Sequence, residues 1–189
     1  MKTVSLFVSL CFGVTLPGMG AFATRVNAQS PAACVGEEYR QLDFWLGNWD
    51  LTWTPTGEGD TAKGTNDITL IMDDCVVQES FKGAGAIGHS VSLYHAPPKK
   101  WRQTWVDNTG GYYALVGGPD DEGFRLDMTR ISDKAPYMRM IWRNIEKDSM
   151  DWRWQRSPDE GKTWEDSWVI HYVRRKQVIG KTGDSKSPP

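Results

Sequence analysis

Apolar and polar residues alternate along most of the chain after residue 47, which is the pattern of β-strands with one buried face. The first run places Trp49, Leu51 and Trp53 on one side and Asp50 and Thr52 on the other. Similar runs predict ten strands, over residues 48–54, 65–72, 75–82, 89–94, 101–107, 112–117, 124–130, 137–145, 150–155 and 164–174.

The links between these segments are short and rich in Gly, Pro, Asn and Asp, as in 83–88 and 108–111. Such residues favour turns, so consecutive segments should form hairpins. A long antiparallel meander hides its edge strands by closing on itself. The sequence therefore predicts an all-β fold, an antiparallel up-and-down β-barrel of about ten strands.

A short helix should precede the barrel. Residues 37–46 carry apolar side chains at helical spacing, namely Tyr39, Leu42, Trp45 and Leu46, and Gly47 follows as a terminator.

Residues 1–28 have the organisation of a secretory signal peptide. Lys2 gives a charged start, residues 4–16 are apolar, and Val26-Asn27-Ala28 is a small-residue cleavage site, with an alternative cut after Ala23. The apolar run is shorter than the roughly 20 residues of a membrane-spanning helix, so we expect cleavage and no stable membrane anchor. The mature protein is then expected to be periplasmic or secreted.

Removing 28 of the 189 residues leaves 161, a length that suits one domain. We expect a barrel domain at 29–179 and a disordered tail at 180–189, where Gly, Lys, Ser and Pro dominate.

Without Lys2 and Arg25, 20 basic residues face 24 acidic ones, so nothing favours nucleic acid as a partner. His89, His95 and His171 lack metal-ligand spacing, and we predict no metal or cofactor. The sequence does not determine the oligomeric state.

Two cysteines remain in the mature chain, Cys34 and Cys75. An even number of cysteines in an exported protein predicts a disulfide, which would tether the N-terminal segment to the third strand. The alternative is two separate buried thiols.

The segment Ser157-Pro158-Asp159-Glu160-Gly161-Lys162-Thr163-Trp164 matches the Asp-box pattern Ser-x-Asp-x-Gly-x-Thr-Trp. Ser157 and Asp159 can accept hydrogen bonds from turn amides, and Trp164 can pack back on the turn. We interpret the motif as a brace for the last hairpin. In the following strand, the period of two places Trp164, Trp168, Ile170, Tyr172 and Arg174 on one face.

The same periodicity nominates the walls of an interior cavity, because a barrel of this size can hold one small ligand. It groups Trp101, Gln103, Trp105 and Asp107 on one face, and it separates Val77, Glu79 and Phe81 from their neighbours. Met138, Met140 and Trp142 form a third such group, and Met150, Trp152 and Trp154 a fourth. The expected ligand-binding residues are Glu79, Trp101, Gln103, Trp105, Asp107, Trp142, Trp152 and Trp154.

Three of the interior candidates could carry proton transfer: Glu79, His89 and Asp107. Burial raises the pKa of a carboxyl, which is one way general acids and bases are made. His89 shares a face with Val91 and Leu93 and so is expected to point inward, near Glu79, provided that the register across 83–88 allows it. The alternative is structural, with indole N–H groups and Gln103 satisfying the carboxylates.

The Gly47-Asn48-Trp49 sequence, within LDFWLGNWDLTW, resembles the N-terminal signature of lipocalins and other calycins. The resemblance implies a tryptophan, Trp49, that plugs the closed end of a ligand-holding barrel, and a late arginine, Arg174, stacked over it. Arg175 takes that place if a bulge shifts the strand. Together with CVVQESF, KWRQTWVDN, SPDEGKTW and YVRR, these residues resemble an uncharacterised family of small exported bacterial lipocalin-like proteins. This resemblance provides no catalytic assignment for any residue of the chain.

These observations favour an exported protein that binds a small hydrophobic or aromatic molecule. The alternative is an enzyme of the cyclase, isomerase or hydrolase kind that uses Glu79 or Asp107 as general acid or base. A third hypothesis makes the tryptophans an outer platform for carbohydrate.

Overall fold

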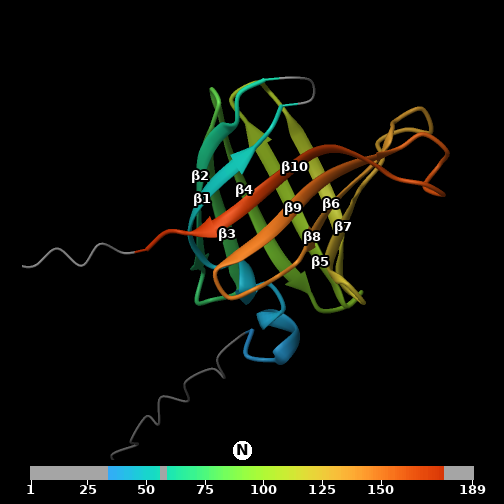
Figure 1. Cartoon of the computed structure of the whole chain (residues 1–189). Coiled ribbons are helices and arrows are strands. Elements are labelled where there is room, and N and C mark those ends of the chain that lie inside the picture. Colours follow the sequence, from blue (N-terminus) through green and yellow to red (C-terminus); the bar gives the residue numbers. More distant parts are fainter. Residues whose placement is uncertain (1–33, 56–58, 177–189) are drawn as a thin grey trace, which may run out of the picture. The chain divides into compact units, whose positions relative to one another are not determined.

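The computed structural model describes residues 34–55 and 59–176, and within them the chain forms one closed barrel (Figure 1). The predicted signal peptide and tail lie outside these residues. The strands are β1 Gly47–Trp53, β2 Ala62–Ile71, β3 Val76–Gly83, β4 Ala86–His95, β5 Lys100–Asp107, β6 Tyr112–Asp120, β7 Gly123–Met128, β8 Tyr137–Arg143, β9 Ser149–Ser157 and β10 Glu165–Arg174.

Each strand pairs antiparallel with the next along the chain, and β1 pairs with β10 to close the barrel. The predicted up-and-down barrel of ten strands is therefore confirmed. Closure leaves no unpaired strand edge within the described barrel, which removes the template for edge-to-edge association. No helix in residues 34–55 and 59–176 has both the length and the apolar character needed to cross a membrane.

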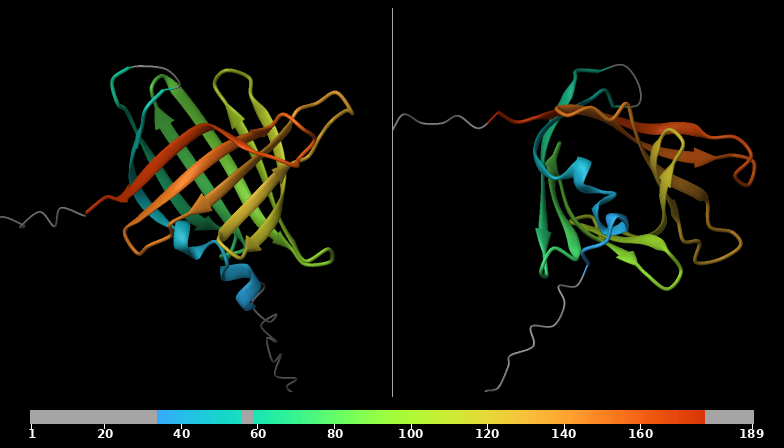
Figure 2. Two further views of the ribbon diagram at one scale, coloured as in Figure 1. Left: turned by 45° about the vertical axis from the view of Figure 1, so that its right-hand side comes forward. Right: turned by 90° about the horizontal axis from the view of Figure 1, so that it is seen from below.

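The expected short helix is present as two 3₁₀ turns, η1 Glu37–Arg40 and η2 Asp43–Trp45. They lie across one end of the barrel, as the view from below shows (Figure 2). Leu42 and Trp45 are fully buried there, and the Trp45 ring meets Trp142 edge-on at 5.1 Å between centroids. This segment closes that end of the barrel with aromatic side chains.

Arg174 and Trp49 hold the same end together. The Arg174 guanidinium lies 4.1 Å from the centre of the Trp49 ring, and its Nη1 donates a hydrogen bond to the Leu46 carbonyl at 2.7 Å. The Trp49 indole N–H donates to the Trp45 carbonyl at 2.8 Å. Gly47 has φ +121°, and a Cβ there would lie 2.4 Å from Arg174 Nη1, so glycine is required for the arginine to sit in place. Arg175 instead binds Asp50.

The predicted disulfide between Cys34 and Cys75 is confirmed. It joins the chain just before η1 to the turn between β2 and β3, across 41 positions of sequence. The closing segment is therefore tied covalently to the barrel that it caps.

The Asp-box turn has the expected internal bonds. Ser157 Oγ accepts from the Gly161 amide at 2.7 Å, Asp159 accepts from the Thr163 amide at 2.7 Å, and the Trp164 indole donates to the Gly161 carbonyl.

The prediction that Trp164 shares a face with Trp168 is wrong. β10 begins at Glu165 and its pairing with β9 shifts between Asp166 and Trp168, so Trp164 stays on the outer surface beside Arg139.

Candidate functional site

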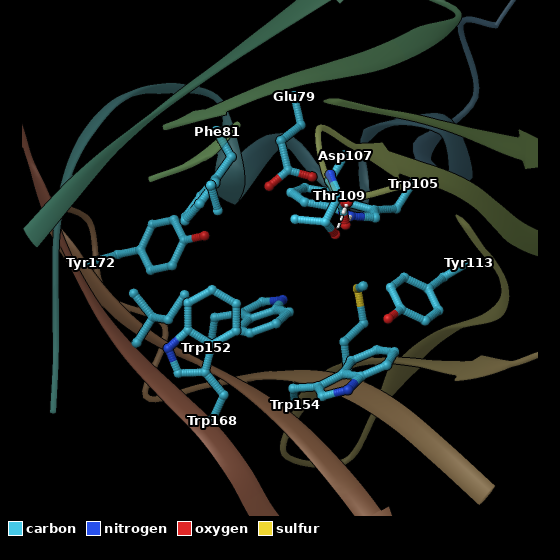
Figure 3. Close-up of a pocket in the computed structure, with 13 residues that line it drawn as sticks. Glu79, Phe81, Trp105, Asp107, Thr109, Tyr113, Trp152, Trp154, Trp168 and Tyr172 are labelled. Carbon is cyan, nitrogen blue, oxygen red and sulfur yellow. Dashed lines mark hydrogen bonds between the residues drawn. The ribbon is translucent and has the colours of Figure 1, made fainter. Parts of the chain in front are cut away.

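A cavity of about 310 Å³ occupies the barrel at the end away from η1 and η2. Its lining is mostly aromatic and comes from strands β3 to β6 and β8 to β10 (Figure 3). The lining residues are Glu79, Phe81, Ala86, Trp105, Asp107, Thr109, Tyr113, Met140, Trp152, Trp154, Trp168, Ile170 and Tyr172.

One wall of the cavity is built from three tryptophans of β9 and β10. The Trp152 and Trp154 rings lie parallel, with 6° between their planes and 6.3 Å between centroids. Trp168 crosses Trp152 at 85° and 5.5 Å. Trp152 and Trp154 project to the same side because they are two positions apart on one strand, while the bulge in β10 sets Trp168 beside them.

Trp105 forms part of the opposite wall and lies directly against the backbone of β4. A Cβ added to Gly88 would lie 2.1 Å from Cζ2 of Trp105, so only glycine leaves room for the ring. The Trp105 indole N–H donates to Asp107 Oδ2 at 3.0 Å. Glycine at position 88 thus sets the position of an aromatic wall.

The loop 108–111 forms one edge of the cavity and is held by Asp107 and Asn108. Asp107 Oδ1 accepts hydrogen bonds from the Thr109 and Gly111 amides, both at 2.9 Å. Asn108 exchanges hydrogen bonds with Ile87 and Gly85 of the β3–β4 hairpin. The hydrogen bonds from Thr109, Trp105 and Gly111 lower the pKa of Asp107 well below its usual range, so this carboxylate is a loop anchor and a poor base near neutral pH.

Glu79 is the acidic residue of the cavity lining whose pKa is raised by burial. Its side chain is only 6% exposed, and its carboxyl points into the space enclosed by the labelled aromatic rings (Figure 3). Oε1 accepts from Asn66 Nδ2 at 2.7 Å and Oε2 from Ser90 Oγ at 2.6 Å. Burial, only partly offset by these bonds, raises the pKa of Glu79 to about 7.

Glu79 belongs to a polar network that crosses the barrel between the closed end and the cavity. Asn66 Nδ2 also donates to the Tyr172 hydroxyl at 3.1 Å, and Gln103 Nε2 donates to Ser90 Oγ at 3.1 Å. Burial raises the pKa of Tyr172 above its ordinary value, so this phenol stays protonated. The network fixes the carboxyl of Glu79 in one orientation, which is what a specific binding site requires.

The prediction that His89 points inward is wrong. β3 and β4 are joined by a two-residue turn in which Ala84 and Gly85 both have positive φ, at 48° and 84°. The resulting register sets Ser90 opposite Glu79 and His89 opposite Ser80, where His89 Nδ1 lies 3.1 Å from Ser80 Oγ on the outer surface. The proposed proton-transfer pair of Glu79 and His89 therefore does not form.

The structure divides the other expected ligand-binding residues into two groups. Glu79, Trp105, Asp107, Trp152 and Trp154 line the cavity. Trp101 and Trp142 are fully buried at the closed end, where Trp101 donates to Gln41 and Trp142 packs on Phe124, and Gln103 lies in the polar network. All three point inward as expected, but they lie outside the cavity lining.

Several residues that line the cavity were not predicted from the sequence. Trp168 and Tyr172 were placed on an inner face but were not recognised as cavity residues, and Tyr113 becomes visible only through its pairing with Trp105. Asn66 and Ser90 donate hydrogen bonds to Glu79 from outside the cavity lining, and the sequence did not single them out, because an isolated polar residue in an alternating strand is expected to point outward.

Trp164 is the one tryptophan of the ten that lies outside the hydrophobic core, so the tryptophans do not form an outer platform. No group of three or more His, Cys, Asp or Glu side chains in the described residues is placed to hold a metal ion. No model of a known protein family and no curated protein matches the chain.

Proposed function

We propose that this protein is an exported binding protein that holds a small hydrophobic or aromatic molecule inside its barrel. The observation that carries the proposal is the cavity, in which seven of the thirteen lining residues are aromatic. Ligand sites are commonly apolar, concave and equipped with a few convergent polar groups, and here Glu79 and Tyr172 supply them. The volume suits a small ligand.

Two features support export. The Cys34–Cys75 disulfide is of a kind that persists in oxidising compartments. The first 28 residues have the charge and hydropathy pattern of a signal peptide. The proposed kinship with lipocalins and other calycins rests on Gly47, Trp49 and Arg174 and on their contacts at the closed end.

A fluorescence titration tests the binding function. N-phenyl-1-naphthylamine, which is uncharged at neutral pH, should enter the cavity, quench tryptophan emission and gain emission of its own. Trp154→Ala removes a cavity wall and should weaken binding about tenfold. Trp164→Ala removes a tryptophan that is also half-buried but lies on the outer surface beside Arg139, and it should leave the affinity unchanged. Equal loss in both variants, or no binding by the natural protein, would refute the proposal.

A second candidate function, general acid–base catalysis, is supported by Glu79 alone. A carboxyl with a pKa of about 7 that faces an aromatic-lined cavity can accept and return a proton near neutral pH. An isomerase, cyclase or hydrolase that uses Glu79 would lose turnover in Glu79→Gln while it still held its substrate. A binding protein has no turnover to lose, so this variant distinguishes the two functions.

A further inference from the structure

Acidic side chains line the cavity, but basic side chains do not. Glu79 and Asp107 are its acidic residues, and none of the thirteen lining residues is Lys, Arg or His. Asp107 is engaged by Thr109, Gly111 and Trp105. Each oxygen of Glu79 accepts one hydrogen bond from a neutral donor. Because a carboxylate has about four acceptor positions, Glu79 retains capacity for a ligand.

None of the ion pairs found in residues 34–55 and 59–176 includes Glu79. A buried carboxylate without a cation is unfavourable, because it loses hydration and gains no opposite charge. A positively charged ligand group would offset that cost. A ligand carboxylate would instead add a second negative charge beside the first.

The aromatic walls favour the same sign of charge. The faces of indole rings attract organic cations, and the attraction grows when the cation is removed from water. Trp105, Trp152, Trp154 and Trp168 all border the cavity that Glu79 faces (Figure 3). A hard metal ion would need six or more oxygen ligands in their place.

From this arrangement we infer that the ligand is an organic ammonium ion: a protonated primary or secondary amine on an aromatic or other apolar body. The ammonium donates hydrogen bonds to Glu79, and the body packs among the tryptophans. The inference rests on the proposed binding function and names the chemical class of its ligand.

Three probes of the same shape and different charge test the inference by calorimetry at about pH 8, where the carboxyl is mostly ionised. The probes are 1-naphthylmethylamine, 1-naphthylmethanol and 1-naphthoate. The amine should bind at least about tenfold more tightly than the alcohol, as expected for a hydrogen bond between charged groups, and naphthoate should bind most weakly. The alcohol or naphthoate binding as tightly as the amine would overturn the inference and leave the binding function standing. No binding of any probe would overturn both.

Two variants test whether Glu79 is responsible for the tighter binding of the amine. Glu79→Gln should reduce amine affinity to about that of the alcohol, with alcohol affinity unchanged. Glu165→Gln, which removes a carboxylate from an exposed position of β10, should leave the preference intact. Amine affinity that survives Glu79→Gln would overturn the inference.

If Glu79→Gln does not fold, amine and alcohol affinities of the natural protein measured over a range of pH test the same inference. Lowering the pH to about 5.5 protonates Glu79 and should reduce the affinity for the amine but not for the alcohol. The other titratable groups that face Glu79 across the cavity are Asp107, Tyr113 and Tyr172. Hydrogen bonds lower the pKa of Asp107, so this carboxylate stays ionised in this range, and burial raises the pKa of Tyr172, so this phenol stays protonated. Amine affinity that does not fall with pH would overturn the inference.

Discussion

Ser90 lies directly opposite Glu79 across the β3–β4 pair, and its hydroxyl donates a 2.6 Å hydrogen bond to Oε2 of the carboxyl. This pairing sets the chemistry of the cavity. Ser90 is a neutral partner for Glu79. A register shifted by one position would have placed His89, which is titratable, opposite Glu79 instead. The carboxyl is thereby held in place and left without a compensating charge.

The first prediction concerns pH and stability. The folded protein retains a proton on Glu79 up to about pH 7, whereas the unfolded chain releases it near 4.5. The stability that this group contributes is therefore fully present below about pH 4.5 and is lost as the pH rises through 7. Natural protein should lose roughly 3 kcal/mol relative to Glu79→Gln across that window.

Urea titrations of the two proteins between about pH 4.5 and 8 measure this difference. The variant keeps Asp107, Tyr113 and Tyr172, the other titratable groups of the cavity, so they contribute equally to both curves. A stability difference that does not change with pH would mean that Glu79 titrates normally.

The second prediction concerns Gly88. Gly88→Ala places a methyl group 2.1 Å from Cζ2 of Trp105, so the indole must move into the cavity. We expect a loss of about 1–3 kcal/mol in stability from overpacking, and weaker binding of the naphthyl probes. Denaturation and probe titration measure the two effects.

Gly118→Ala is the matched control on the barrel wall. An added Cβ at Gly118 meets one atom of Trp101 at 4.0 Å, an ordinary contact, so probe affinity should be unchanged. Equal losses of affinity in the two variants would argue against a specific role for Gly88.

The third prediction concerns the closed end. Arg174→Lys keeps a positive charge but loses the planar group that covers Trp49 and the hydrogen bond to Leu46. It should cost about 1–3 kcal/mol of unfolding free energy. Arg156→Lys, at an exposed position of β9, should cost no more than about 0.5 kcal/mol. Indistinguishable variants would show that the stacked arginine adds little.

The fourth prediction concerns the disulfide. Replacing Cys34 and Cys75 together by serine opens a loop spanning 41 positions and should reduce stability by about 4 kcal/mol in the chain-entropy model. Reduced natural protein should match the double variant in denaturant titrations. If the oxidised and reduced forms unfold at the same denaturant concentration, the bond does not stabilise the cap.

The sequence by itself determined those features that depend on residues near one another in the chain. Alternation along single strands predicted the barrel, and the helical spacing of Leu42 and Trp45 predicted the closing segment. The Asp box was recognisable for the same reason, since Ser157, Asp159 and Thr163 bond to one another across a few positions.

Only the tertiary structure decided which face of β4 is buried and where along the barrel each inner residue lies. Ile87, Val91 and Leu93 made the outer face of β4 look like a core face, and the turn at Ala84 and Gly85 fixed the opposite register. Trp142 and Trp152 both point inward, yet one packs at the closed end and the other lines the cavity. Periodicity gives the side of a strand on which a residue lies, but depth in a barrel depends on how all the strands are staggered against one another.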